Sequence, residues 1–94
     1  MITGIMLMVM MVEHQELFIC RNKVEIKGEK GDLVSLIPLL GNCQGVITKG
    51  LKWDLQGETL KVGRSRGVSN VMLGKKAEIS LKKGCLLVVK TNLL

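Results

Sequence analysis

Residues 32–39 read DLVSLIPL, a short apolar run that ends near a proline. Similar runs recur along the chain; they are short, rich in β-branched residues and separated by glycine, asparagine or charged pairs, which is typical of β-strands. Pro38 has no backbone N–H, so it is tolerated only at a strand end, an edge or a bulge. No segment keeps a helical apolar stripe over ten residues. The sequence therefore predicts an all-β fold, an antiparallel β-sandwich with jelly-roll or barrel-like character and little or no helix.

Three turns are expected between the strands. Glu13-His14-Gln15 forms a hairpin turn, Arg21-Asn22 makes a two-residue connection, and Lys82-Lys83-Gly84 closes a final hairpin in which glycine supplies a positive φ. The expected strands are 5–12, 16–20, 23–27, 32–39, 45–48, 51–55, 59–62, 77–81 and 85–90.

The composition describes one small domain that spans residues 1–94. The chain is 47% hydrophobic, mostly through aliphatic residues, which is ample for a core. A domain of this size has a modest stability margin, so pairing with a second chain or domain is expected. The net charge is +6, and the basic residues are scattered along the chain and form no long run of like charges. This favours a solvated basic face over a nucleic-acid-binding tail.

The cysteines and the N-terminal segment indicate the cellular compartment in which the protein is expected. Cys20, Cys43 and Cys85 form no CxxC pair, which is typical of neither a disulfide framework nor a zinc site. Reduced, buried thiols in a cytoplasmic protein fit this pattern best. Residues 5–12 read IMLMVMMV, far short of the roughly 20 residues that span a bilayer. A buried strand is expected there, with no membrane partner and no signal peptide.

Groups able to support catalysis are few. The chain has two aspartates, six scattered glutamates and one histidine, His14, which is expected in an exposed turn. No carboxylates are paired to hold Mg²⁺, and no phosphate-binding GxxxxGK[ST] motif occurs. No catalytic or metal-binding residues are therefore predicted, and this chain by itself is not expected to be an enzyme.

Residues 48–55, TKGLKWDL, contain the only tryptophan, Trp53, in a chain that has no tyrosine and one phenylalanine. On a strand, Trp53 would share one face with Leu51 and Leu55, and the lysine and aspartate between them would point to the other face. Periodicity alone thus favours a core tryptophan. The alternative is a surface ring, left open by Gly50, on which a planar or cationic ligand stacks.

A second polar segment is GRSRGVSN, residues 63–70. Arg64 and Arg66 between glycines could bind an anion, although an exposed turn is the simpler interpretation, and their role stays open. Ser69 and Asn70 carry groups that both donate and accept hydrogen bonds, which suits the edge of an aminopyrimidine. A turn in which asparagine bonds its own backbone is equally consistent with the sequence.

Taken in order, these segments closely resemble the C-terminal domain of thiamine pyrophosphokinases. That family shows a SLIPL strand, a GVTTKGLKWPL segment, a G-x-SN element and a final G-x-LLV hairpin. The resemblance spans residues 5–90, and its most specific parts are TKGLKW and SN. The matching pieces here are LVSLIPL (33–39), GVITKGLKWDL (45–55), GVSN (67–70), AEISL (77–81) and GCLLVV (84–89).

The resemblance implies an enzyme that transfers a pyrophosphoryl group from ATP to thiamine, giving thiamine diphosphate and AMP. It implies a nucleotide-binding α/β domain that carries ATP and Mg²⁺, and a β-sandwich that forms the homodimer and binds thiamine. The thiamine pocket is then expected between the sandwich of one subunit and the nucleotide domain of its partner. By this resemblance Trp53 stacks on the vitamin, Ser69 and Asn70 line its pyrimidine end, and Thr48, Gly50 and Leu51 form nearby backbone and wall positions.

The chain departs from the family pattern in two ways. The nucleotide-binding domain with its acidic motif is missing from these 94 residues, so the chain alone is expected to bind no cofactor and to be inactive. Asp54 also stands where the family commonly has proline. Two alternatives remain open: a small basic β-barrel that binds nucleic acid, and a purely structural dimerisation domain.

Overall fold

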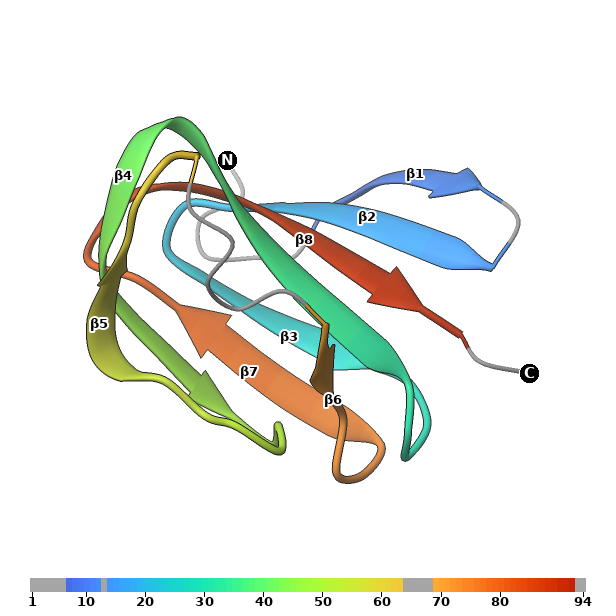
Figure 1. The fold of residues 1–94 in the computed structure, drawn as a ribbon. Helices are drawn as coiled ribbons and strands as arrows, with labels where there is room; N and C mark the ends of the chain where they lie inside the picture. Colours follow the sequence, from blue (N-terminus) through green and yellow to red (C-terminus); the bar gives the residue numbers. More distant parts are fainter. Residues whose placement is uncertain (1–6, 13, 64–68, 93–94) are drawn as a thin grey trace.

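The computed structural model describes residues 7–12, 14–63 and 69–92, and the described residues contain no helix. Every strand pairing is antiparallel (Figure 1). The all-β prediction is therefore confirmed. The strands are β1 (Leu7–Val12), β2 (Gln15–Cys20), β3 (Lys23–Lys27), β4 (Leu33–Lys49), β5 (Gln56–Leu60), β6 (Asn70–Val71), β7 (Lys76–Ser80) and β8 (Lys83–Thr91).

The strands form two layers that share one long strand, β4. The first layer, here the β8 sheet, contains β1, β2, β8, the first half of β4 and β6; the second, the β7 sheet, contains β3, β7, the second half of β4 and β5. Between the halves, Leu40 and Gly41 take φ angles of 60° and 135°, and the strand turns over (Figure 1). A bend inside one strand thus connects the two sheets and nearly closes them into a barrel.

The core lies between the two sheets. In β3, for example, Val24 and Ile26 are buried while the charged residues between and beside them face outward, as the period of two requires. The same alternation buries Phe18 and Cys20 of β2, Val34 and Leu36 of β4, Ala77 and Ile79 of β7, and Leu86 and Val88 of β8.

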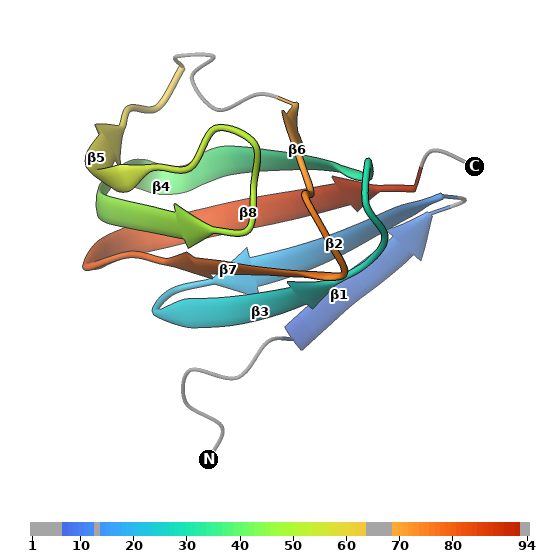
Figure 2. The same cartoon turned by 90° about the horizontal axis from the view of Figure 1, so that it is seen from below.

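Two short connections carry the chain from one sheet to the other. Arg21-Asn22 leads from β2 to β3, and residues 81–82 lead from β7 to β8; within neither pair are the two strands neighbours in a sheet. The predicted hairpin at Lys82-Lys83-Gly84 is therefore wrong, because the chain crosses between layers there and Lys83 already belongs to β8. The N–H of Leu81 donates to the carbonyl of Asn22 (3.0 Å), which ties the two crossings together (Figure 2).

The remaining strand predictions are mostly confirmed. Strand 23–27 agrees at both ends, and β1 and β2 form the predicted hairpin, with Val12 opposite Gln15 and Glu13 outside the described residues. The predicted strands 32–39 and 45–48 are halves of β4, because positive-φ glycines bend the strand without ending it. Pro38 has β8 on one side, and no described strand pairs with it on the other, which fits the edge position expected for it.

The three cysteines are free and buried, as the sequence predicts. Burial raises the pKa of the Cys20 thiol to about 11, and it also raises the pKa of Cys43. The Cys43 thiol donates to the carbonyl of Cys85 at 3.2 Å. Cys20 and Cys43 are therefore protonated, weakly polar members of the core.

One charged group is buried at the end of β8. The Lys90 ammonium lies 3.3 Å from Glu16 Oε2 and 3.8 Å from Asp32 Oδ2, and it donates to the carbonyl of Lys27 at 3.1 Å. Gly28 leaves the space this requires, because a Cβ there would lie 2.7 Å from Asp32 Oδ2 and 3.1 Å from Lys90 Cδ. This buried ion cluster, Lys90 with Glu16 and Asp32, connects β8, β2 and the loop before β4.

Candidate functional site

Directly after β4, residues 50–55 form a turn that presents Trp53 at the surface. The predicted strand 51–55 is wrong: Leu51 makes one isolated bridge with Met72, and Lys52 and Trp53 lie in a turn. Leu51 and Leu55 are buried, whereas Trp53 is 58% exposed. Because these residues form a turn and not a strand, their side chains do not alternate between two faces. The interpretation of Trp53 as a core residue, which rested on that alternation, is therefore wrong.

The buried side chain of Thr48 and the partly buried side chain of Asp54 hold this Trp53 turn together. Thr48 Oγ1 donates to Asp54 Oδ1 (2.8 Å) and accepts from the N–H of Leu55 (2.8 Å), while the N–H of Leu51 donates to the same carboxylate oxygen (3.0 Å). Asp54, which replaces the family's proline, therefore fixes the turn by accepting two hydrogen bonds. The sequence analysis missed this role of Asp54 because no pattern in TKGLKWDL indicates that its carboxylate closes a turn.

Asn70, from the other side, clamps the backbone of Trp53. Its Oδ1 accepts from the N–H of Trp53 (3.0 Å) and from its neighbour Val71 (2.9 Å), and its Nδ2 donates to the Trp53 carbonyl (2.8 Å). Asn70 is only 5% exposed. Its side chain thus bonds its own backbone neighbour, one of the two possibilities left open by the sequence, and also fixes the Trp53 turn across 17 residues of chain.

The segment 69–73 joins this turn to the start of β4. On one side, Lys52 N donates to Val71 O (2.8 Å) and Leu73 N donates to Gly50 O (3.0 Å). On the other side, β6 pairs with Leu33 and Val34. Ser69, exposed and with a φ of 60°, donates its N–H to Ser35 Oγ at 3.3 Å. β6 therefore bridges the two sheets at the end of the molecule that carries Trp53.

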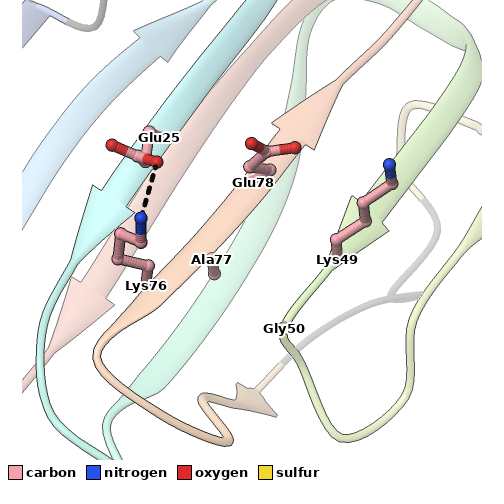
Figure 3. Close-up of a pocket in the computed structure, with 6 residues that line it drawn as sticks. All are labelled: Glu25, Lys49, Gly50, Lys76, Ala77 and Glu78. Carbon is pink, nitrogen blue, oxygen red and sulfur yellow. Dashed lines mark ion pairs between the residues drawn. The ribbon is translucent and has the colours of Figure 1, made fainter.

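Gly50 is required for close packing. Its φ is 90°, and a Cβ there would lie 2.6 Å from the carbonyl oxygen of Lys76. Beside it is a shallow hollow of about 180 Å³ on the outer face of the β7 sheet, lined by Glu25, Lys49, Gly50, Lys76, Ala77 and Glu78 (Figure 3). Trp53 does not line this hollow, and the Lys76–Glu25 ion pair (3.8 Å) spans part of it.

Lys52 corrects a further expectation. The sequence placed it on the face opposite Trp53, but its Nζ lies over the Trp53 ring, 4.8 Å from the ring centroid. The turn brings the two adjacent side chains to the same side, where the ammonium meets the electron-rich ring face. The Lys52 ammonium therefore already lies over one face of the Trp53 ring.

Hydrogen bonds join Asn70 to Trp53, and Thr48 and Leu51 to Asp54, whereas Ser69 bonds to Ser35 and Gly50 accepts from Leu73 N. Trp53 and Ser69 reach solvent, whereas Thr48, Leu51 and Asn70 are buried and Gly50 packs against β7. Contact of these residues with a vitamin stays a prediction. Arg64 and Arg66 lie outside the described residues. No helix in the described part of the chain is long and apolar enough to cross a membrane.

Fold and site together define an antiparallel β-sandwich domain that holds an exposed tryptophan on a hydrogen-bonded turn. Residues 21–86 match the family model of the thiamin pyrophosphokinase vitamin B1 binding domain, which includes the whole Trp53 turn and Asn70. The chain belongs to this family. Comparison with curated protein sequences gives no match.

Solved structures of thiamine pyrophosphokinases share the fold. The enzyme from Bacillus subtilis superposes with a TM-score of 0.78 at 18% identity, and the match covers 87% of this chain and 40% of that one. For the yeast enzyme the TM-score is 0.65 at 22% identity, covering 83% and 27%. For the Candida albicans enzyme it is 0.62 at 11% identity, covering 83% and 31%. The match therefore covers 40% or less of each of these proteins.

Proposed function

We propose that this chain binds thiamine by stacking on Trp53, and that it is the thiamine-binding and dimerisation part of a thiamine pyrophosphokinase. The observation that carries the proposal is the exposed Trp53 ring on a turn held by Thr48, Asp54 and Asn70. The backbone that carries the ring is held by these hydrogen bonds, and the Lys52 side chain lies over the ring face. Stacking on such a fixed ring loses little conformational entropy on binding.

The chemistry of thiamine suits this surface. Its pyrimidine is planar and its thiazolium is a cation, and both gain from contact with the face of an indole. Ser69, exposed beside the clamped Asn70, offers a hydroxyl to the polar edge of the pyrimidine. A domain with a net charge of +6 offers a cation no long-range attraction, so we expect weak affinity from this chain alone.

Pyrophosphoryl transfer is proposed for the whole enzyme rather than for this chain. The chain covers 40% of the Bacillus subtilis enzyme, and ATP and Mg²⁺ are expected on the nucleotide-binding domain of the family. Within residues 7–12, 14–63 and 69–92, no group of three or more His, Cys, Asp or Glu side chains could hold a metal ion. The proposal accordingly assigns no Mg²⁺ ligand to this chain, and we expect it to be inactive without the other domain.

Calorimetric titration with thiamine tests the site. We expect saturable binding to the wild type and at least a tenfold loss in Trp53→Ala, because an aromatic contact is worth roughly 0.5–1.5 kcal/mol beyond the area it buries. Trp53→Phe should keep part of the affinity. Val62→Ala, which shortens another exposed apolar side chain, is the matched control. Absence of binding up to millimolar thiamine, or equal binding by folded Trp53→Ala, would exclude the proposed site.

The homodimer is proposed on separate grounds. Among the residues whose exposure the structure describes, five large hydrophobic residues besides Trp53 are exposed, and Leu40 at the bend of β4 is 91% exposed: Ile37, Leu40, Ile47, Val62 and Leu73. A small aliphatic domain gains stability by covering such residues with a second copy. Sedimentation equilibrium should show a monomer–dimer equilibrium that shifts with protein concentration. A monomer at every concentration from micromolar to hundreds of micromolar would contradict it.

A further inference from the structure

The side chain of Lys52 covers the ring that is proposed to receive the vitamin. Its ammonium lies 4.8 Å from the Trp53 ring centroid, and no carboxylate among the described residues forms an ion pair with it. The nearest acidic residue in sequence, Asp54, uses Oδ1 to accept from Thr48 and Leu51. The positive charge of Lys52 is therefore not neutralised by an ion pair within the described structure.

This charge acts in opposite directions on two forms of the vitamin. Thiamine itself is a cation, so its thiazolium must displace the Lys52 ammonium from the ring face or stack beside it against repulsion. Thiamine diphosphate carries the same rings joined to a group with more than one negative charge. An ammonium on a flexible four-carbon stem can leave the ring and bind that phosphate while the rings stack.

The charges around the turn reinforce this difference. Lys49 precedes the turn, and the Lys76 side chain lies on the opposite side of the hollow from Lys49, beside Glu25 (Figure 3). Of the carboxylates in that hollow, Glu25 pairs with Lys76 at 3.8 Å, and Glu78 pairs with Lys23 at 3.7 Å. A ligand that carries phosphates thus meets unneutralised positive charge at the Trp53 turn and no unpaired carboxylate in the hollow beside it.

We propose that Lys52 is a specificity-determining residue that makes this domain prefer phosphorylated thiamine, above all the diphosphate, over thiamine. The inference rests on the proposed function, since it assumes that the vitamin stacks on Trp53. It adds a selection by charge at the same ring. In the reaction of the family, the diphosphate is the product, so Lys52 would retain product more strongly than substrate.

Calorimetric titrations of thiamine and thiamine diphosphate into the wild type and Lys52→Met test the proposal. Methionine keeps an unbranched apolar stem against the ring and removes only the charge. We expect Lys52→Met to bind thiamine about two- to fivefold more tightly, the affinity equivalent of an exposed cation–π contact, and the diphosphate at least as many times more weakly. Lys83→Met is the control: it makes the same charge change at the start of β8, opposite Gln44.

Each outcome decides one question. Opposite changes for the two ligands in Lys52→Met, with little change in Lys83→Met, support the proposal. Equal changes for both ligands, or equal effects of the two variants, overturn the role of Lys52 while leaving thiamine binding intact. If neither ligand binds the wild type, the proposed function itself fails and this inference with it.

Discussion

The Trp53 turn and the buried ion cluster around Lys90 use polar side chains in opposite ways. At the turn, the buried side chains of Thr48 and Asn70 bond to backbone and to Asp54, and an apolar ring is left in solvent. At the ion cluster, a lysine that is 4% exposed bonds to carboxylates and a carbonyl, and a charge is left inside. Both reverse the usual arrangement of polar groups outside and apolar groups inside, but only the turn leaves an aromatic ring exposed.

The two regions are also physically connected. Asp32, which faces Lys90, accepts a hydrogen bond from Met72 N at its backbone carbonyl (2.8 Å), and Gly31 N donates to Met72 O (2.9 Å). Met72 in turn forms the bridge to Leu51 in the Trp53 turn. Backbone hydrogen bonds thus connect the loop that carries Asp32 to the Trp53 turn. The two neighbouring regions differ in what they leave exposed: the ion cluster buries a charge, and the turn presents an aromatic ring.

The largest expected effect comes from removing the buried charge. Lys90→Met should lower the free energy of unfolding by about 3–5 kcal/mol, because it leaves Asp32 buried without its partner. Urea denaturation measures this difference. Lys83→Met, on the same strand but exposed, should change stability by no more than about 0.5 kcal/mol.

A second variant distinguishes charge from packing at this site. Adding Asp32→Asn to Lys90→Met removes the orphaned charge while keeping an oxygen that can accept from Glu29 N, as Asp32 does at 2.9 Å. Recovery of part of the lost stability supports the electrostatic explanation. If the double variant is less stable than Lys90→Met alone, the unpaired charge of Asp32 is not what destabilises Lys90→Met. The electrostatic explanation of the ion cluster, and its contrast with the Trp53 turn, would then be wrong.

A smaller effect is expected from loosening the turn. Asn70→Ala removes the hydrogen bonds to both the N–H and the carbonyl of Trp53 and should cost about 1–3 kcal/mol, the penalty for leaving partly buried polar groups unsatisfied. Hydrogen exchange at the Trp53 amide should accelerate, and thiamine affinity should fall because the ring is no longer held. Denaturation, amide exchange and calorimetry measure the three quantities.

Asn42→Ala is the matched control for Asn70→Ala. Asn42 Oδ1 also accepts a backbone N–H, from Val62 at 3.0 Å, but in an exposed position where water can replace it. Its loss should cost less than that of Asn70 and leave the Trp53 amide unaffected. Equal costs for the two variants would mean that the clamp on Trp53 is no stronger than an ordinary surface contact.

The sequence predicted strands better than it predicted their connections. Local alternation in 23–27 and the apolar runs 85–90 and 32–39 are signals that a strand carries within itself. The residues of a short connection do not indicate whether the next strand pairs in the same sheet or lies in the other one. Two residues with a glycine suit a hairpin as well as a crossing between sheets. The error at Lys82-Lys83-Gly84 has this cause. The predicted strand 51–55 failed because Leu51, Trp53 and Leu55 alternate correctly, yet Asp54 closes a turn instead.

The amino-acid sequence alone determined the all-β class, most strand positions, the burial of the cysteines and, through TKGLKW and SN, the family. Each depends on residues that are near one another in the chain. Only the tertiary structure decided that Trp53 is exposed and that Lys52 lies over its ring. The physical reason is that the bonds that shape this turn come from Thr48 and from Asn70, which lies 17 residues beyond Trp53 and is brought to it by the pairing of β6 with β4.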